Sequence, residues 1–323
     1  MTQTPQKPIG SGFGHDTSVD DIVGNTDLSG KNYIVTGGYS GLGLEGVKAL
    51  AKAGAHVTVP ARNRAKAETA LSPYSGQIEI ANMDLSDLES VRKFAADYAD
   101  TQRPLHALIN NAGVMACPLS RIGNGWESQF ATCHIGHFEL TKGLEHTLKN
   151  TENARVVALS STAHIISDIH WDDPHFNKHD YDKWQAYGQA KSANALFALG
   201  LDRQWQADGV RGFSVHPGGI FTPLQRHLTD EEMVVLGWKN ADGTIPPAVQ
   251  AMFKTPEQGG ATALWCALSP QLSGMGGVYC EDCDIAQAAD ENSQRYHHAR
   301  DWICDPDKAD KLWDMTETMI AQS

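Results

Sequence analysis

Short runs of β-branched and other apolar residues alternate along the chain with longer segments in which apolar positions recur every three or four residues. The runs are typical of buried strands, and the segments between them, such as 42–53 and 86–98, are long enough for helices. The predicted strands cover 33–36, 56–59, 78–81, 107–110, 155–159, 212–215 and a last stretch near 277–279. This alternation predicts an α/β fold, a doubly wound parallel sheet covered by helices on both faces.

Two segments depart from this alternation. Residues 1–28 are rich in Gly, Pro, Asp and Thr, which predicts an N-terminal arm with little regular structure of its own. Residues 29–323 are then expected to form a single domain that ends in a C-terminal extension. Within it, the stretch from about 220 to 258 carries prolines and scattered large apolar residues after a strand end, where open α/β sheets place ligands. We interpret it as a substrate lid; the alternative is a surface helical excursion that packs on the core.

The composition narrows the choice of partners and compartment. A net charge of −13 repels phosphate backbones and anionic membrane surfaces, so we expect neither nucleic acid nor a membrane as a partner. No apolar run reaches the roughly 18–20 residues that cross a bilayer, and residues 1–16 lack the apolar core of a secretory signal. Six scattered cysteines are typical of reduced thiols and indicate a cytoplasmic protein. Cys280 and Cys283 have the spacing of a metal knuckle but lack a second matched pair, so we expect no metal site.

A glycine-rich turn joins the first predicted strand to a helix. It contains Gly37, Tyr39, Ser40, Gly41, Leu42 and Gly43. The glycines let the backbone turn tightly and approach a pyrophosphate, while the helix N-terminus offers free N–H groups. Because the turn lies in the first strand–helix–strand unit, it predicts a dinucleotide site.

The end of the second predicted strand bears on the choice between NAD and NADP. An NAD site typically has a carboxylate here that accepts from the ribose 2′-OH, but this chain has Ala61 followed by Arg62. Arg64 and Lys66 lie close behind in a chain that is otherwise strongly acidic. Because a guanidinium binds phosphate with two hydrogen bonds, Arg62 favours NADP(H) over NAD.

Tyr187 and Lys191 lie four residues apart in a segment with helical character. This spacing places both side chains on one helix face, where an ammonium would lower the pKa of the phenol. A tyrosine with such a neighbour can act as a general acid or base near neutral pH. The spacing is common by chance, so its weight depends on the motifs around it.

Five motifs occur in order along the chain: 36–43, 110–113, the pair Ser160-Ser161, Tyr187 with Lys191, and 216–219. In this order the chain resembles the short-chain dehydrogenase/reductase family over essentially residues 30–290. The strings at 133–138 and 186–194 resemble the retinol-dehydrogenase-like branch. The resemblance implies a Rossmann-type fold, a nicotinamide cofactor and hydride transfer at an alcohol or carbonyl carbon.

The resemblance also implies a role for each matching residue. Ser161 would hydrogen-bond the substrate oxygen, Tyr187 would exchange a proton with it, and Lys191 would bind the nicotinamide ribose and lower the tyrosine pKa. Further cofactor contacts would come from Asp84, Leu85, Asn111, Ala112, Gly113, Pro217, Gly218 and Thr222. A homo-oligomer is implied too, because relatives often pair through the helix that carries the tyrosine and lysine.

The chain departs from the branch at two places. Cys133 stands where Asn is usual, and in relatives that Asn helps hold a water that links the lysine to solvent. Either the main-chain carbonyl of Cys133 suffices, which we favour, or the proton relay is impaired, since a thiol is a poor hydrogen-bonding substitute. The stretch 164–184 is longer than in many relatives, and its aromatic residues either line the substrate pocket or pack the loop onto the domain.

We therefore expect an oxidoreductase that transfers a hydride between NADP(H) and a small carbonyl or alcohol substrate with hydrophobic or aromatic groups. One alternative is a catalytically weak NADP(H)-binding redox sensor, which Cys133 slightly favours and the intact Ser161, Tyr187 and Lys191 disfavour. Another is an enzyme that acts on a sugar nucleotide. The sequence shows no obvious second basic site for another diphosphate, which disfavours it.

Overall fold

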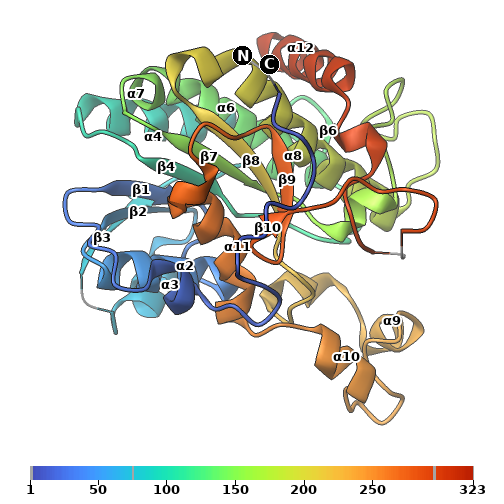
Figure 1. The fold of residues 1–323 in the computed structure, drawn as a ribbon. Helices are drawn as coiled ribbons and strands as arrows, with labels where there is room; N and C mark the ends of the chain where they lie inside the picture. The colour runs from blue at the N-terminus through green and yellow to red at the C-terminus, as the bar shows by residue number, and fades with distance from the viewer. Residues whose placement is uncertain (1–2, 75, 294–295, 323) are drawn as a thin grey trace.

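The computed structural model describes residues 3–74, 76–293 and 296–322. Within these ranges an eight-stranded sheet runs in the order β10-β9-β8-β7-β4-β1-β2-β3, with β10 antiparallel to β9 and the other neighbours parallel (Figure 1). A short antiparallel hairpin, β5–β6, lies apart from it. The strands are β1 (Asn32–Val35), β2 (His56–Ala61), β3 (Gln77–Asn82), β4 (Ala107–Asn110), β5 (Arg121–Ile122), β6 (Trp126–Glu127), β7 (Arg155–Leu159), β8 (Arg211–His216), β9 (Val278–Glu281) and β10 (Asp284–Ile285).

Helices cover both faces of this sheet (Figure 1). One face carries α1 (Val19–Val23), α2 (Gly41–Lys52) and α11 (Pro256–Leu268), and the other carries α4 (Leu88–Asp100), α6 (Gly136–Gly143) and α8 (Lys183–Trp205). The remaining α-helices are α3 (Arg64–Leu71), α5 (Ser128–Phe130), α7 (Glu145–Lys149), α9 (Asp230–Val235), α10 (Pro247–Met252) and α12 (Pro306–Ala321). A π-turn, η1 (Ala131–Ile135), and 3₁₀ turns η2 (Thr162–Ile165), η3 (Gln206–Asp208), η4 (Pro223–His227), η5 (Pro270–Leu272) and η6 (Asp301–Ile303) complete the elements.

The seven predicted strands are present with ends within two residues of those expected, and the predicted fold class is confirmed. The central strands β1, β4 and β7 are buried along their whole length, which explains their continuous apolar runs. The order of the parallel strands reverses direction between β1 and β4. In open α/β sheets this reversal opens a crevice beyond the carboxyl ends of the strands, and the predicted motifs converge there.

The N-terminal arm lies along the sheet edge formed by β9 and β10, where Figure 1 draws it in dark blue. The Gln6 side chain pairs with the backbone of Tyr279 and donates to the carbonyl of Ala286 at 2.7 Å. The carboxylate of Asp284 accepts from the backbone N–H groups of residues 9–11. These contacts cover a sheet edge that would otherwise be open for pairing.

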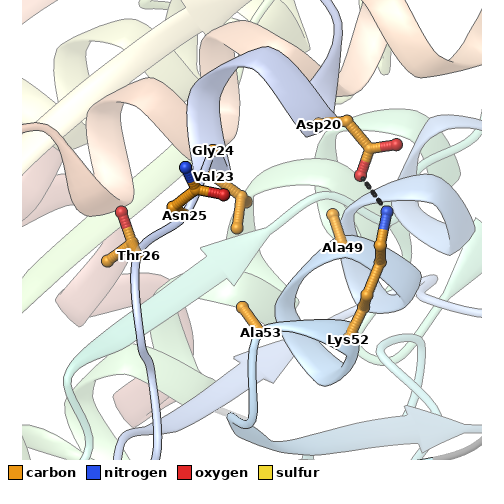
Figure 2. Close-up of a pocket in the computed structure, with 8 residues that line it drawn as sticks. All are labelled: Asp20, Val23, Gly24, Asn25, Thr26, Ala49, Lys52 and Ala53. Atoms are coloured by element: carbon orange, nitrogen blue, oxygen red, sulfur yellow. Dashed lines mark hydrogen bonds and ion pairs between the residues drawn. The ribbon is translucent and has the colours of Figure 1, made fainter.

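A surface hollow of about 290 Å³ lies where α1 meets the end of α2 (Figure 2). Lys52 and Asp20 form an ion pair across it at 3.2 Å. Since α2 begins at the glycine turn and rises ~1.5 Å per residue, this hollow lies about a helix length from the predicted site.

Among the described residues, no helix is long and apolar enough to cross a membrane.

In the C-terminal extension, α12 packs along the outer side of α8. A Cβ at Gly200 of α8 would lie 3.4 Å from the carbonyl oxygen of Ala309, so the absence of a side chain lets the two helices approach closely. Trp313 is buried against Phe138 and Phe197, with ring centroids 4.7 and 5.9 Å away. As a result α8 has α12 on one side and the sheet on the other.

Candidate active site

The glycine turn has a backbone shape that side chains would disturb. Gly37 and Gly41 have φ values of 65° and 54°, in the region that favours glycine. A Cβ at Gly37 would lie 3.1 Å from the Cα of Ala112. At Gly41 it would lie 3.4 Å from the Thr222 side chain. The turn therefore brings two other predicted cofactor residues, Ala112 and Thr222, close to the start of α2.

The N-terminus of α2 lacks the side-chain cap found on the other long helices. Ser40 occupies the N-cap position but makes no capping hydrogen bond. By contrast, α4, α8 and α11 are capped by Asp87, Asp182 and Thr255. The first N–H groups of α2 thus have no side-chain acceptor, and their partial positive charge suits the pyrophosphate of a dinucleotide.

Thr36, which precedes the turn, organises a buried network that the sequence analysis missed. The backbone N–H groups of Asn111 and Ala112 both donate to the Thr36 hydroxyl oxygen at 2.9 Å. That hydroxyl lies 2.9 Å from Nε2 of His137, whose Nδ1 lies 2.9 Å from the carbonyl oxygen of Cys133. Because a carbonyl only accepts, Nδ1 carries the proton and Nε2 accepts from Thr36. Burial lowers the pKa of His137 to about 4, so the ring is neutral and can play both roles.

The other predicted cofactor residues surround this network. Asp84 follows β3, and its carboxylate accepts from the N–H and hydroxyl of Ser86, which fixes the loop. Leu85 packs so closely on the start of α6 that a Cβ at Gly136 would lie 2.3 Å from its carbonyl oxygen. Gly113 lies between the active-site side chains, since a Cβ there would be 3.3 Å from Sγ of Cys133 and 3.8 Å from Nζ of Lys191.

The loop after β8 contains Pro217, Gly218 and Thr222. Gly218 has a φ of 97°, and a Cβ there would lie 2.7 Å from the Lys254 side chain. The Lys254 ammonium is buried and pairs with Asp282 at 2.5 Å. The backbone N–H of Lys254 donates to the Gly219 carbonyl at 2.8 Å. Lys254 thus fastens the far end of the 220–253 segment to the loop from which that segment starts.

Arg62 lies at the end of β2 and is exposed. Arg64 is engaged, because it pairs with Glu68 at 2.8 Å and donates to the Ile80 carbonyl at 3.0 Å. Within the described ranges no carboxylate pairs with Arg62, so its guanidinium is available to a ligand. The two arginines differ in this respect, although the sequence grouped them together.

Ser161, Tyr187 and Lys191 meet beyond the carboxyl end of β7. Ser161 begins η2, and its side chain lies close enough to the Tyr187 hydroxyl to lower the pKa of that phenol. Lys191 lies one helical turn further along α8, with Nζ 5.5 Å from the Tyr187 ring centroid. Its ammonium donates to the Leu159 carbonyl at 2.9 Å, and Asn194 donates to the same oxygen at 2.8 Å. The sequence predicted all three residues, and the structure brings them together.

The pKa of Tyr187 shifts in a direction that the sequence did not predict. Burial, together with the nearby Cys133, raises the pKa of Tyr187 above its usual range, while the influence of the Ser161 side chain opposes this shift. Burial also lowers the pKa of Lys191. The direction for Tyr187 is opposite to that expected from the Tyr-Lys spacing, because desolvation of the phenolate dominates in this arrangement.

Cys133 lies in the π-turn η1, which interrupts the helical run from α5 to α6. Its thiol is fully buried and donates to the Val114 carbonyl at 3.5 Å, while its own carbonyl accepts from His137. Burial raises the pKa of this thiol. A π-turn widens the backbone locally and is often found at functional sites.

The long stretch between Ser161 and Tyr187 mostly packs onto the domain. Phe176 is buried, and the Tyr181 hydroxyl lies 2.9 Å from the Cys117 carbonyl and 3.2 Å from Glu127. Trp184 is the exception, because its ring lies 6.3 Å from that of Tyr187 in an edge contact. Of the two interpretations, packing holds for Phe176 and Tyr181, and proximity to the site holds for Trp184.

An apolar cluster adjoins Tyr187 and includes residues of the 220–258 segment. Leu228 is buried in it, and Leu224, Met233 and Trp238 pack against it with Trp184. Lys183 and Glu232 form an ion pair that ties α9 to the start of α8. The base of the segment is closed by a bridge between Gly219 and Phe253. The segment thus begins and ends at neighbouring positions in the loop after β8, and its apolar residues pack beside Tyr187.

Comparisons with known proteins agree with this geometry. Residues 31–233 match the family model described as short chain dehydrogenase. A "Probable oxidoreductase" of Streptomyces lividans is 41% identical over 293 residues, which cover 89% of this chain and 97% of that protein. Retinol dehydrogenase 12 of Mus musculus is 38% identical over 264 residues, 80% of each chain. The crystal structure of an uncharacterised protein from Mycobacterium paratuberculosis has a TM-score of 0.69 at 29% identity and covers 92% of this chain and 96% of its own.

Proposed function

The chain belongs to the short-chain dehydrogenase family and is an oxidoreductase of that type, and we propose that it transfers a hydride between NADP(H) and a carbonyl or alcohol carbon. The catalytic residues in this proposal are Ser161, Tyr187 and Lys191. One observation carries it: the Ser161 side chain lies close enough to the Tyr187 hydroxyl to lower its pKa, and the Lys191 ammonium lies 5.5 Å from the tyrosine ring.

The residues of the crevice fit a nicotinamide dinucleotide. The uncapped start of α2 suits the pyrophosphate, and Gly37 and Gly41 add no side chain of their own to the turn that faces it. Arg62 is exposed directly after β2, and a guanidinium there supports NADP(H), because it can bind a 2′-phosphate with two hydrogen bonds. When bound, the nicotinamide supplies or accepts the hydride.

The three catalytic side chains divide the remaining work. The phenol of Tyr187 is protonated at neutral pH, so it can donate its proton to the substrate oxygen as a carbonyl is reduced. The Ser161 hydroxyl holds the same oxygen beside the phenol. Lys191 uses one N–H on the Leu159 carbonyl and keeps its others for the cofactor's ribose hydroxyls.

The segment 220–258 forms the lid of this site in our proposal. The apolar cluster of Leu228, Leu224, Met233, Trp184 and Trp238 supplies a wall beside Tyr187 that suits a hydrophobic or aromatic substrate. Its two ends join at the bridge between Gly219 and Phe253, so the lid can move as a unit about that point.

The proposal is tested with Tyr187→Phe and a panel of aldehydes, ketones and secondary alcohols of graded size. Turnover should collapse while NADPH binding persists, because the ring remains and the proton donor is lost. Tyr181→Phe is the matched control, a partly buried tyrosine whose hydroxyl contacts Glu127 and Cys117, and it should keep its turnover. Unchanged turnover in Tyr187→Phe would defeat the mechanism, and NADPH binding without turnover of any panel member would favour the sensor alternative.

The cofactor choice is tested with two arginine variants. Arg62→Ala should lower kcat/KM for NADPH by about 10- to 100-fold and change that for NADH little, the loss expected for a charged hydrogen bond. Arg64→Ala is the control, because Arg64 is engaged with Glu68 and the Ile80 carbonyl. A clear preference of the unaltered protein for NADH would overturn the assignment.

A further inference from the structure

We propose that His164 is a positioning residue for Ser161, whose imidazole fixes the serine's carbonyl and ties it to the C-terminal segment 299–302. The inference rests on the proposed role of Ser161 in holding the substrate oxygen. His164 lies in η2, the turn that Ser161 begins, and it is completely buried. It does not touch the reacting atoms, so its effect on the reaction passes through Ser161.

His164 donates two hydrogen bonds to the Ser161 carbonyl, one from its ring and one from its backbone. Its Nδ1 lies 2.7 Å from the Ser161 carbonyl oxygen, and its backbone N–H donates to the same oxygen at 3.1 Å. The carbonyl can only accept, so Nδ1 carries the ring proton. These two hydrogen bonds to one oxygen set the orientation of the peptide plane that follows Ser161. They thereby set the direction in which the serine side chain points.

The other ring nitrogen faces the C-terminal extension. The backbone N–H of Arg300 donates to Nε2 of His164 at 3.3 Å. Burial lowers the pKa of His164 to about 4, so at neutral pH the ring offers one donor and one acceptor. A neutral imidazole presents these on opposite edges, so one side chain joins the serine turn to the extension.

Trp302 strengthens the same junction. Its indole N–H lies 3.2 Å from the His164 carbonyl and 3.3 Å from the hydroxyl of Ser192, which directly follows Lys191. The segment 299–302 therefore contacts both the turn that carries Ser161 and the helix that carries Lys191. A shift of this segment would move the two catalytic residues relative to each other.

The turn has little room to adopt another position. A Cβ at Gly188, next to Tyr187, would lie 2.8 Å from the Ala163 carbonyl oxygen, so η2 rests directly on α8. The Thr162 N–H donates to Nδ1 of His216 at 3.3 Å, and the Tyr279 ring meets His164 edge-on with ring centroids 4.9 Å apart. Because neighbouring atoms pack tightly around η2, loss of the imidazole removes the hydrogen bonds but leaves the turn no alternative position.

The test compares His164→Phe, His164→Asn and a control, His134→Phe. His134 is also buried and also contacts the C-terminal extension, through Thr316, but it does not contact the serine turn. His164→Phe should lower kcat about 10- to 100-fold, the loss expected when a reacting group is displaced, with NADPH affinity nearly unchanged. His164→Asn should recover much of that loss, because the asparagine amide can occupy the place of Nδ1 and donate to Ser161.

A second readout does not depend on activity. Amide hydrogen exchange in peptides covering 160–166 should speed up in His164→Phe and in Trp302→Phe, the milder variant that keeps the ring but loses the indole donor. If the unaltered protein turns over no substrate, the proposed function fails while the exchange result still decides the positioning role. Unchanged exchange together with a kcat within about twofold of the unaltered protein would overturn the inference, as would equal losses of kcat in His164→Phe and His134→Phe.

Discussion

The imidazole of His137 donates to the carbonyl of Cys133 at 2.9 Å, and this bond links the π-turn to the strand end that carries the glycine motif. Through Thr36 the ring also reaches the N–H groups of Asn111 and Ala112. Three motifs that are far apart in the sequence thus share one buried, fully paired chain of hydrogen bonds. Such chains are costly to interrupt, because each group left without a partner keeps its desolvation cost.

Replacing His137 should weaken both the fold and the cofactor site. In His137→Phe the Thr36 hydroxyl keeps only its long hydrogen bond to the Ile109 carbonyl at 3.4 Å, and the Cys133 carbonyl loses a donor, so the free energy of unfolding should fall by about 1–3 kcal/mol. The KM for NADPH should rise more than kcat falls, because Asn111 and Ala112 lie on the cofactor side of the network. Chemical denaturation and NADPH titration measure the two effects. His146→Ala, on the surface of α7, is the control and should change neither.

Cys133→Asn should change kcat only modestly, within about fivefold. The carbonyl of Cys133 has a second lone pair beyond the one that His137 uses, so the main chain can serve a proton relay whichever side chain is present. Steady-state kinetics at saturating cofactor measure the change. A gain of orders of magnitude would mean that the thiol impairs the relay and that the main-chain interpretation is wrong.

The sequence predicted the sheet well, because strands buried on both faces are mostly apolar, as 107–109 and 156–159 are. It also identified Ser161, Tyr187 and Lys191 by their order among the motifs. It missed contacts that depend on the fold alone: His137 lies 101 residues from Thr36, and Gln6 lies 273 residues from Tyr279. The raised pKa of Tyr187 could not be read from its spacing to Lys191 either, since burial decides its direction.

The two directions of the reaction should differ in their dependence on pH. Because the folded-state pKa of Tyr187 is raised, the phenol stays protonated through the neutral range and carbonyl reduction should stay level from about pH 6 to about pH 9. Alcohol oxidation needs the phenolate, so its rate should rise with pH over the same range. Profiles of kcat/KM in both directions measure this. A reduction rate that falls as the pH rises through neutrality would show that Lys191 and the cofactor lower the tyrosine pKa below its usual range.

The position of α12 predicts how the chain associates. The expected pairing of two chains through the tyrosine-bearing helix requires an open outer face of α8, but α12 covers that face at Gly200 and Arg203, the latter paired with Asp310 at 2.9 Å. The unaltered protein should therefore not dimerise through α8, and light scattering coupled to gel filtration, with crosslinking of α8, measures this. Trp313→Ala should cost about 3–5 kcal/mol of stability and loosen α12, because it removes a ring buried against Phe138 and Phe197.

Once α12 is loosened, the apolar side of α8 is exposed and the variant should associate in a concentration-dependent way. Asp314→Ala lies on the exposed side of the same helix and should behave like the unaltered protein. A dimer formed through another face would leave α12 in place, so the buried surface, and not the mass alone, distinguishes the two cases. Crosslinks between the α8 helices of two unaltered chains would contradict it, because the two helices cannot meet while α12 lies between them.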